Sequence, residues 1–152
     1  MADLTISIKK SDVYEEVAKT TAYIGAKNKL EDGKSAFDQV FVTDADLAMI
    51  ERFYNESVDT LMNLLKRFVA ELNSENGNIN WKLSMSDRFD NNLGTSITRS
   101  ATSFLVNSII GKWCEITAPD KVKEYEDNAA ALLTDIKDKV FHKSAPSRVK
   151  PT

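Results

Sequence analysis

The sequence contains few residues whose types and spacing could support catalysis. Gly33-Lys34-Ser35 is similar to the end of a phosphate-binding loop, but Asn28 stands where such a loop has its first glycine. Cys114 and His142 are the only cysteine and the only histidine. They cannot form a cluster of Cys and His metal ligands, and their separation along the chain does not support a thiol nucleophile with its base. We predict no catalytic residue and no cofactor.

Paired carboxylates occur at two places and are better explained by local structure than by a metal ion. Asp44 and Asp46 stand just before a long apolar pattern, where acids stabilise the positive end of a helix, and Thr43 can cap its first turn. Asp87 and Asp90 lie in a polar stretch without a neighbouring base or nucleophile, so they are typical of a turn. We predict no metal site.

The longest periodic pattern runs from Thr43 to Leu72 and predicts one amphipathic helix. Thirty residues at 1.5 Å each make a rod of roughly 45 Å, which is longer than one small core requires. Its apolar residues recur every three or four positions. They are Leu47, Ile50, Tyr54, Val58, Leu61, Leu65, Phe68 and Leu72. Met49, Phe53 and Met62 lie off this stripe, so we expect a second covered face.

Two stretches alternate between apolar and polar residues, which predicts half-buried strands. They are Leu4–Ile8 and Ile79–Met85. We expect these strands to pair with each other, within one chain or between adjacent subunits. Further helices are predicted from Ser11 to about Lys27, from about Asn92 to Ile116, and from Asp120 to Phe141. The predicted fold is mainly α, with an antiparallel four-helix arrangement around one long central helix and a small two-stranded β element.

Length and charge indicate one small domain without a nucleic-acid or membrane function. The 152 residues are enough for one core, and we place a single helical domain at residues 1–141. The net charge of -3 and an isoelectric point near 5.2 argue against specific nucleic-acid binding. No apolar run approaches the ~20 residues of a membrane span.

The last segment, residues 142–152, is predicted to be an extended strap because Pro146 and Pro151 prevent a helix. From Lys143 onward it carries basic residues and no acid, so it could contact phosphate or an acidic protein surface; a solvated, disordered terminus is the alternative. The predicted partner-binding residues are Phe141, His142, Lys143, Pro146, Arg148, Val149, Lys150 and Pro151.

A subunit interface is predicted where the strands and the second apolar face of the long helix meet a neighbour. Strand sharing between adjacent copies and the length of the helix both suit such a contact. The predicted interface residues are Leu4, Ile6, Ile8, Met49, Phe53, Met62, Ile79, Trp81 and Leu83.

The order of these elements resembles the head-tail adaptor, or connector, family of tailed bacteriophages. The resemblance rests on the acid-rich helix start from Thr43 to Ile50, on the small and apolar helix from Ile97 to Trp113, and on the proline break before the last helix. It covers roughly residues 11–141. The two strands depart from the plainest family members.

The resemblance implies a structural virion protein. Copies of such an adaptor, commonly twelve, form a ring that docks on the portal, contacts the next tail or neck ring protein, and continues the DNA channel without binding DNA specifically. By that analogy residues 141–152 grip the portal. The expected location is the neck of the virion, after synthesis in the bacterial host cytoplasm. The alternative is a bacterial helical interaction or regulatory module that forms no ring and binds a partner helix on the Met49/Phe53/Met62 face.

Overall fold

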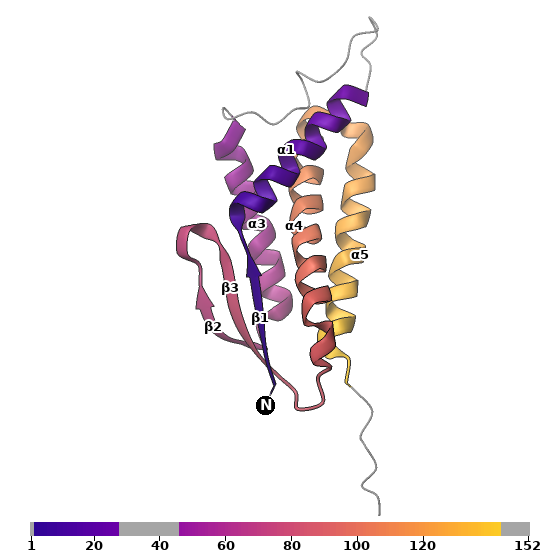
Figure 1. Cartoon of the computed structure of the whole chain (residues 1–152). Helices are drawn as coiled ribbons and strands as arrows, with labels where there is room; N and C mark the ends of the chain where they lie inside the picture. The colour runs from indigo at the N-terminus through magenta and orange to yellow at the C-terminus, as the bar shows by residue number, and fades with distance from the viewer. Residues whose placement is uncertain (1, 28–45, 144–152) are drawn as a thin grey trace, which may run out of the picture.

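The computed structural model describes residues 2–27 and 46–143, and Figure 1 shows how their helices and strands are arranged. The predictions for Gly33-Lys34-Ser35 and for the Thr43 cap lie outside these residues. The elements in chain order are β1 (Ala2–Ile8), α1 (Lys10–Lys27), α3 (Leu47–Leu65), β2 (Val69–Asn73), β3 (Ile79–Met85), α4 (Gly94–Thr117) and α5 (Val122–Phe141).

Within the described residues the fold is mainly α, as predicted, with four long helices and a three-stranded antiparallel sheet. The strands lie in the order β1-β3-β2. β1 and β3 pair within the chain, with Ile6 opposite Trp81. This settles the question of whether these two strands pair within one chain or between subunits. The predicted two-stranded element is too small because β2 completes the sheet.

The predicted helix from Thr43 to Leu72 is wrong at its C-terminal end. α3 stops at Leu65, and the chain turns through Lys66 and Arg67 into β2. Pairing with β3 begins at once, because the Ser84 N–H donates to the Phe68 carbonyl at 2.7 Å. A free edge of β3 therefore pairs with residues whose spacing also suits a helix. A partner so far away in the sequence cannot be inferred from local periodicity.

The central helix of the fold is α4 rather than the predicted helix at 43–72. α4 has 24 residues, and it packs against α5, α3, α1 and β1. Figure 1 shows α4 between α3 and α5, with α1 crossing over them and the sheet beside them. Small residues allow this crowding: Ala101 is fully buried on α4, and Gly111 lies against Tyr125 and Glu126 of α5.

One face of the sheet is buried under the helices and the other is polar. Alternation along β3 is nearly complete, with Ile79, Trp81, Leu83 and Met85 buried and the residues between them more exposed. On the outer face Lys82 forms an ion pair with Asp3 of β1 at 3.8 Å. The alternation of apolar and polar residues in the sequence thus indicates a sheet that is covered on one side.

The hairpin between β2 and β3 is fastened to the helices. Asn76 and Gly77 adopt positive φ values of 57° and 78°, which suits an Asn-Gly turn. The Tyr54 hydroxyl of α3 donates to the Gly77 carbonyl at 2.6 Å, and the Lys10 backbone N–H donates to Asn78 Oδ1 at 2.9 Å. The tip of the hairpin is therefore held by the start of α1 and by the first half of α3.

Candidate functional site

The strand residues that the sequence nominates for a subunit interface are core residues of the single chain. They are Leu4, Ile6, Ile8, Ile79, Trp81 and Leu83, with exposed fractions between 0 and 7%. Their side chains pack under the chain's own helices, so they offer little side-chain surface to a neighbour. A neighbouring subunit could reach these strands only at the edges or on the polar face of the sheet.

The three nominated residues of α3 lie in different environments. Phe53 is buried at 8% exposure, Met62 is half-buried, and Met49 is 41% exposed. The Met49/Phe53/Met62 face is therefore not one continuous exposed surface. Leu47, which the sequence assigns to the buried stripe, is 43% exposed because it stands at the first turn of α3, beyond the cover of the core.

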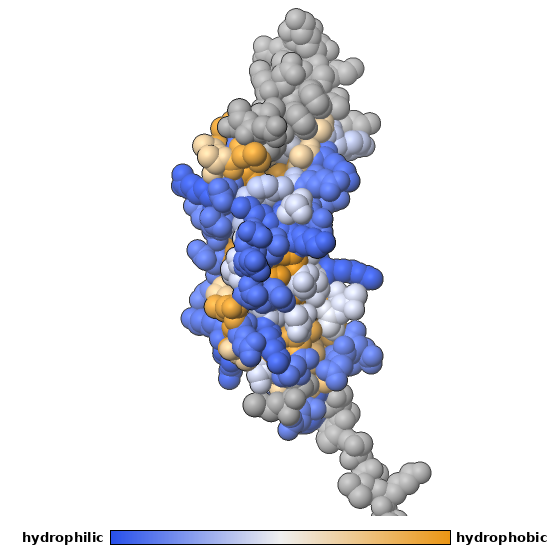
Figure 2. All heavy atoms as spheres, turned by 60° about the vertical axis from the view of Figure 1, so that its left-hand side comes forward, coloured by the Kyte–Doolittle hydropathy of each residue, from blue (hydrophilic) through white to orange (hydrophobic). Residues whose placement is uncertain are grey.

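Exposed apolar side chains gather at the helix ends on one end of the molecule. We call this set the apolar end: Tyr23 of α1, Leu47 and Met49 of α3, and Ile116 of α4. In Figure 1 these three helix ends lie together at the top. Figure 2 shows hydrophobic surface at the same end, above a flank that is mostly hydrophilic. Exposed apolar surface that is gathered rather than scattered is typical of an interaction site.

The opposite end of the molecule anchors the start of the predicted strap. The ring of Phe141, at the end of α5, makes an edge contact with Phe68 at 5.2 Å between centroids. The Arg67 guanidinium lies 5.9 Å and 5.7 Å from the centroids of these two rings. Lys143 pairs with Phe89 in an isolated antiparallel bridge. His142 is exposed, and Pro146, Arg148, Val149, Lys150 and Pro151 lie outside the described residues.

The role of Arg67 and Phe68 was missed in the sequence, which places both residues within the predicted helix from Thr43 to Leu72, with Phe68 on its apolar stripe. The two residues occupy the turn that leads into β2, and this turn brings them to Phe141. A cation above an aromatic ring contributes about 0.5–1 kcal/mol at an exposed site. No signal in the sequence could have revealed this contact, because it depends on where α3 ends.

The polar clusters in the described residues connect elements and are not arranged for catalysis. The Lys10 amine contacts Glu51 at 2.9 Å and lies near the rings of Tyr14 and Tyr54. The hydrogen bond with Glu51 raises the pKa of Lys10, and burial raises the pKa of Tyr54 to about 12. Both groups keep their protons at neutral pH, so neither can act as a base there.

A second cluster joins α4 to α5. The Ser100 hydroxyl donates to Asp135 at 2.7 Å, and the Lys139 amine donates to the same carboxylate at 2.6 Å. The Lys139 amine and then the Ser100 hydroxyl lower the pKa of Asp135. A carboxylate that a cation keeps ionised links the two helices and does not readily accept a proton.

Cys114 and the remaining carboxylates give no nucleophile or metal centre in the described part of the chain. Burial raises the pKa of the Cys114 thiol to about 11, so the sulfur stays protonated at neutral pH. Among residues 2–27 and 46–143, no group of three or more His, Cys, Asp or Glu side chains is placed to hold a metal ion. The same residues include no helix that is long and apolar enough to span a membrane.

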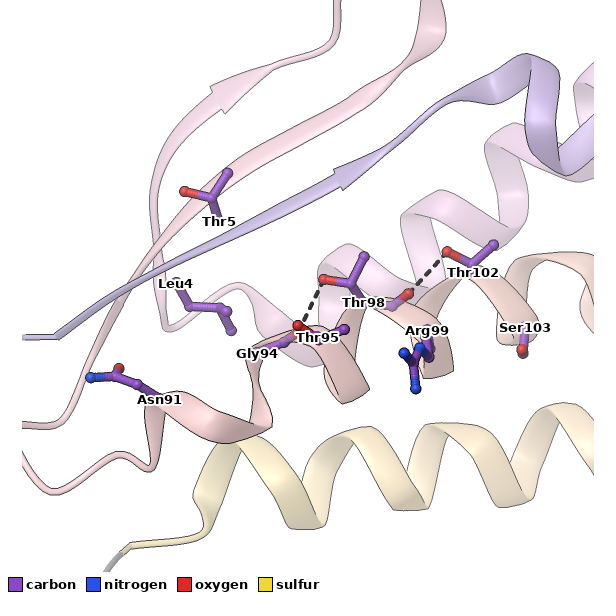
Figure 3. Close-up of a pocket in the computed structure, with 9 residues that line it drawn as sticks. All are labelled: Leu4, Thr5, Asn91, Gly94, Thr95, Thr98, Arg99, Thr102 and Ser103. Atoms are coloured by element: carbon purple, nitrogen blue, oxygen red, sulfur yellow. Dashed lines mark hydrogen bonds between the residues drawn. The ribbon is translucent and has the colours of Figure 1, made fainter.

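A groove runs along the outer edge of β1, between that strand and the first half of α4 (Figure 3). Its volume is about 690 Å³. Leu4 points into the core and Thr5 points away from it, so a hollow lined by both lies at the strand's edge. The other lining residues are Asn91, Gly94, Thr95, Thr98, Arg99, Thr102 and Ser103.

Two threonines on the floor of this groove use their hydroxyls within α4 itself. The Thr98 hydroxyl donates to the Gly94 carbonyl at 3.1 Å, and the Thr102 hydroxyl donates to the Thr98 carbonyl at 2.9 Å. These bonds, drawn in Figure 3, direct the polar part of each side chain to its own helix and leave the methyl groups on the groove surface. Such a floor suits an apolar side chain better than a polar ligand.

In comparisons with known proteins, no family model, curated protein or solved structure matches this chain. Its function must therefore be argued from the surfaces above. Sequence patterns pointed to the strap and to part of the apolar end. They could not indicate the groove, because the groove depends on which strand lies at the sheet edge beside α4.

Proposed function

We propose that this chain is a structural virion protein that forms a head-tail connector ring on the portal of a tailed bacteriophage. The order of its elements supports the proposal. In the part of the chain that the structure describes, a first helix is followed by an amphipathic helix, a hairpin, a long central helix, a proline turn at Pro119–Lys121 and a last helix. A proline-containing segment then follows, as the resemblance to connectors leads one to expect.

The observation that carries the proposal is that the two ends of the molecule are built differently. The apolar end exposes Leu47 and Ile116 at 43% and 58%. The other end carries Phe141 and Lys143, each held on the body by contacts with residues far away in the sequence. A ring member must contact one neighbour above the ring and a different neighbour below it, and two ends of different chemistry suit that position.

The proposed mechanism is assembly. The strap residues after Lys143 dock on the portal, where Arg148 and Lys150 meet an acidic or polar surface. The apolar end is covered by the next neck or tail protein, and burial of apolar area there contributes ~25 cal/mol per Å². DNA passes through the ring without specific contacts.

The direct test is the mass and the partner of the purified chain. Native mass spectrometry and negative-stain imaging, alone and with the portal protein encoded by a neighbouring reading frame, should reveal rings or portal-bound copies. A strict monomer that ignores the portal would contradict the proposal and favour the alternative, a helical interaction module without a ring.

The strap gives a sharper prediction. Deletion of residues 144–152 should abolish portal binding in a pull-down assay. The helical circular dichroism should be unchanged, because Phe141 and Lys143 and their contacts with Phe68 and Phe89 are retained. The charge-reversed variant Arg148→Glu/Lys150→Glu keeps the length and both prolines, and it should weaken portal binding as well, because the two cations are proposed to meet the portal surface. If the deletion variant still docks, the strap is not the portal contact.

A further inference from the structure

Both outer strands of the sheet have an unpaired edge. In the described residues β1 and β2 each pair with β3 alone, so one side of each strand lacks a backbone partner. Unpaired edges readily accept another strand and are usually shielded. β2 is poorly shielded: four of its five residues are exposed, and Leu72 is exposed at 58%.

The position of Leu72 indicates what is missing at this edge. It stands opposite Trp81, and Trp81 points to the helix side of the sheet, so Leu72 points to that side as well. Trp81 is 1% exposed because helices cover it, whereas the helices of the same chain leave most of Leu72 uncovered. A helix from elsewhere would complete this layer.

The free edge of β1 lies beside such a helix, α4. Its groove lies over the threonine methyl groups of α4, and it extends from Gly94 to Ser103, which is roughly 14 Å at the helical rise. An extended strand of five residues spans about 16 Å. β2 has five residues, so its length matches the groove.

The two faces of β2 fit the same pairing. Glu71 pairs with Lys82 and lies on the polar face of the sheet, whereas Leu72 lies on the helix side. A second copy of β2 would thus bring an exposed leucine to a floor of methyl groups and keep its one carboxylate on the polar face.

We infer that β2 of one copy adds to the edge of β1 of the next copy, with Leu72 seated on Thr98 and Thr102 in the groove. This inference rests on the proposed ring and names its subunit contact. β1 and β2 are both antiparallel to β3, so they run parallel to each other within the chain. Copies related by rotation about an axis along the strands therefore pair β2 with β1 as a parallel ladder. Because the two edges differ, the contact is heterologous and can close into a ring.

Disulfide cross-linking between two variants tests the contact directly. In a Cys114→Ala background, Thr5→Cys or Ser7→Cys is mixed with Glu71→Cys and oxidised mildly; all three positions are exposed on the polar face of the sheet. We expect a mixed dimer on a non-reducing gel. Asn80→Cys, on the same face of the central strand β3, is the matched control and should not cross-link. Cross-linking of Thr5→Cys with itself would instead indicate a two-fold β1:β1 contact and overturn the inference.

A second pair of variants tests the seat of Leu72. Leu72→Asp should weaken each contact roughly ten- to hundredfold, so that rings dissociate in native mass spectra. Ile116→Asp changes an equally exposed residue at the apolar end and should leave rings intact. Both sites are exposed, so both variants should fold, and circular dichroism checks this.

The outcomes separate this inference from the proposed function. Rings that persist in Leu72→Asp, or that form without the mixed cross-link, overturn the β2-to-β1 contact and leave the connector proposal standing. Cross-linked rings that ignore the portal support the contact and contradict the connector proposal. A chain that stays monomeric, with and without the portal, overturns both.

Discussion

At the scale of single residues, Trp81 shows how packing and polarity oppose each other in this core. Its indole is 1% exposed on the helix side of β3. The Nε1–H is buried and has no hydrogen-bond partner among the described residues. Leaving a buried donor without an acceptor costs about 1–3 kcal/mol, while the large ring buries apolar area and fills the space beneath the helices.

Trp81→Phe should therefore change stability little. Loss of ring volume destabilises the fold, but removal of the unpartnered N–H offsets it, so we expect a change in the free energy of unfolding within about 1 kcal/mol. Leu83→Ala is the contrast on the same face of β3: it is fully buried and has no polar group, so it should cost about 2–5 kcal/mol. Urea denaturation measures both. A loss for Trp81→Phe as large as that for Leu83→Ala would show that removal of the N–H does not offset the loss of ring volume.

At the scale of elements, α4 contains two glycines with different surroundings. A Cβ at Gly111 would lie 3.5 Å from Tyr125 and Glu126 of α5, which is ordinary van der Waals contact. A Cβ at Gly94 would lie 3.1 Å from Leu4 Cδ1 of β1, so the strand or its side chain would have to move. Glycine thus lowers stability in the middle of the helix, whereas at the start of the helix it avoids a tight contact with Leu4.

Gly111→Ala should stabilise the protein by about 0.5–1 kcal/mol, because alanine has the higher helix propensity and meets no clash. Gly94→Ala should stabilise the protein less than Gly111→Ala or should destabilise it, since the added methyl group crowds Leu4. Thermal and urea unfolding of both variants give the comparison. If Gly111→Ala is the more destabilised of the two, α4 and α5 approach more closely than these distances indicate.

At the scale of the whole molecule, the sheet and the helices share one hydrophobic core. Buried residues of β1, β3 and all four long helices form a single cluster in the described chain. Neither layer can therefore lose its cover without exposing the other, which is typical of a fold that unfolds in one step.

Unfolding should accordingly be cooperative across both layers. Trp113 of α4 and Trp81 of β3 are both buried and report on different layers. In a Trp113→Phe variant, urea unfolding followed by Trp81 fluorescence should coincide with the loss of helical circular dichroism. An earlier fluorescence transition would mean that the sheet opens as a separate unit.

Local patterns in the sequence determined most of the elements, because burial of one face imposes its period on the residues. Alternation predicted β1 and β3, and helical spacing predicted α1, α4 and α5 close to their observed bounds. The middle of α3 is also as predicted, with Ile50, Tyr54 and Leu61 buried. The proline break before α5 follows directly from the chemistry of Pro119.

Only the tertiary structure decided where α3 ends, which helix is central and which surfaces remain open. Residues Val69–Asn73 suit a helix by their spacing but form β2, because β3 supplies backbone partners from another part of the chain. The contact of Phe141 with Phe68 and the groove beside β1 follow from that choice. A sequence pattern indicates which face of a segment is buried, but not which segment covers that face. The candidate surfaces of this protein depend on which segments cover which faces.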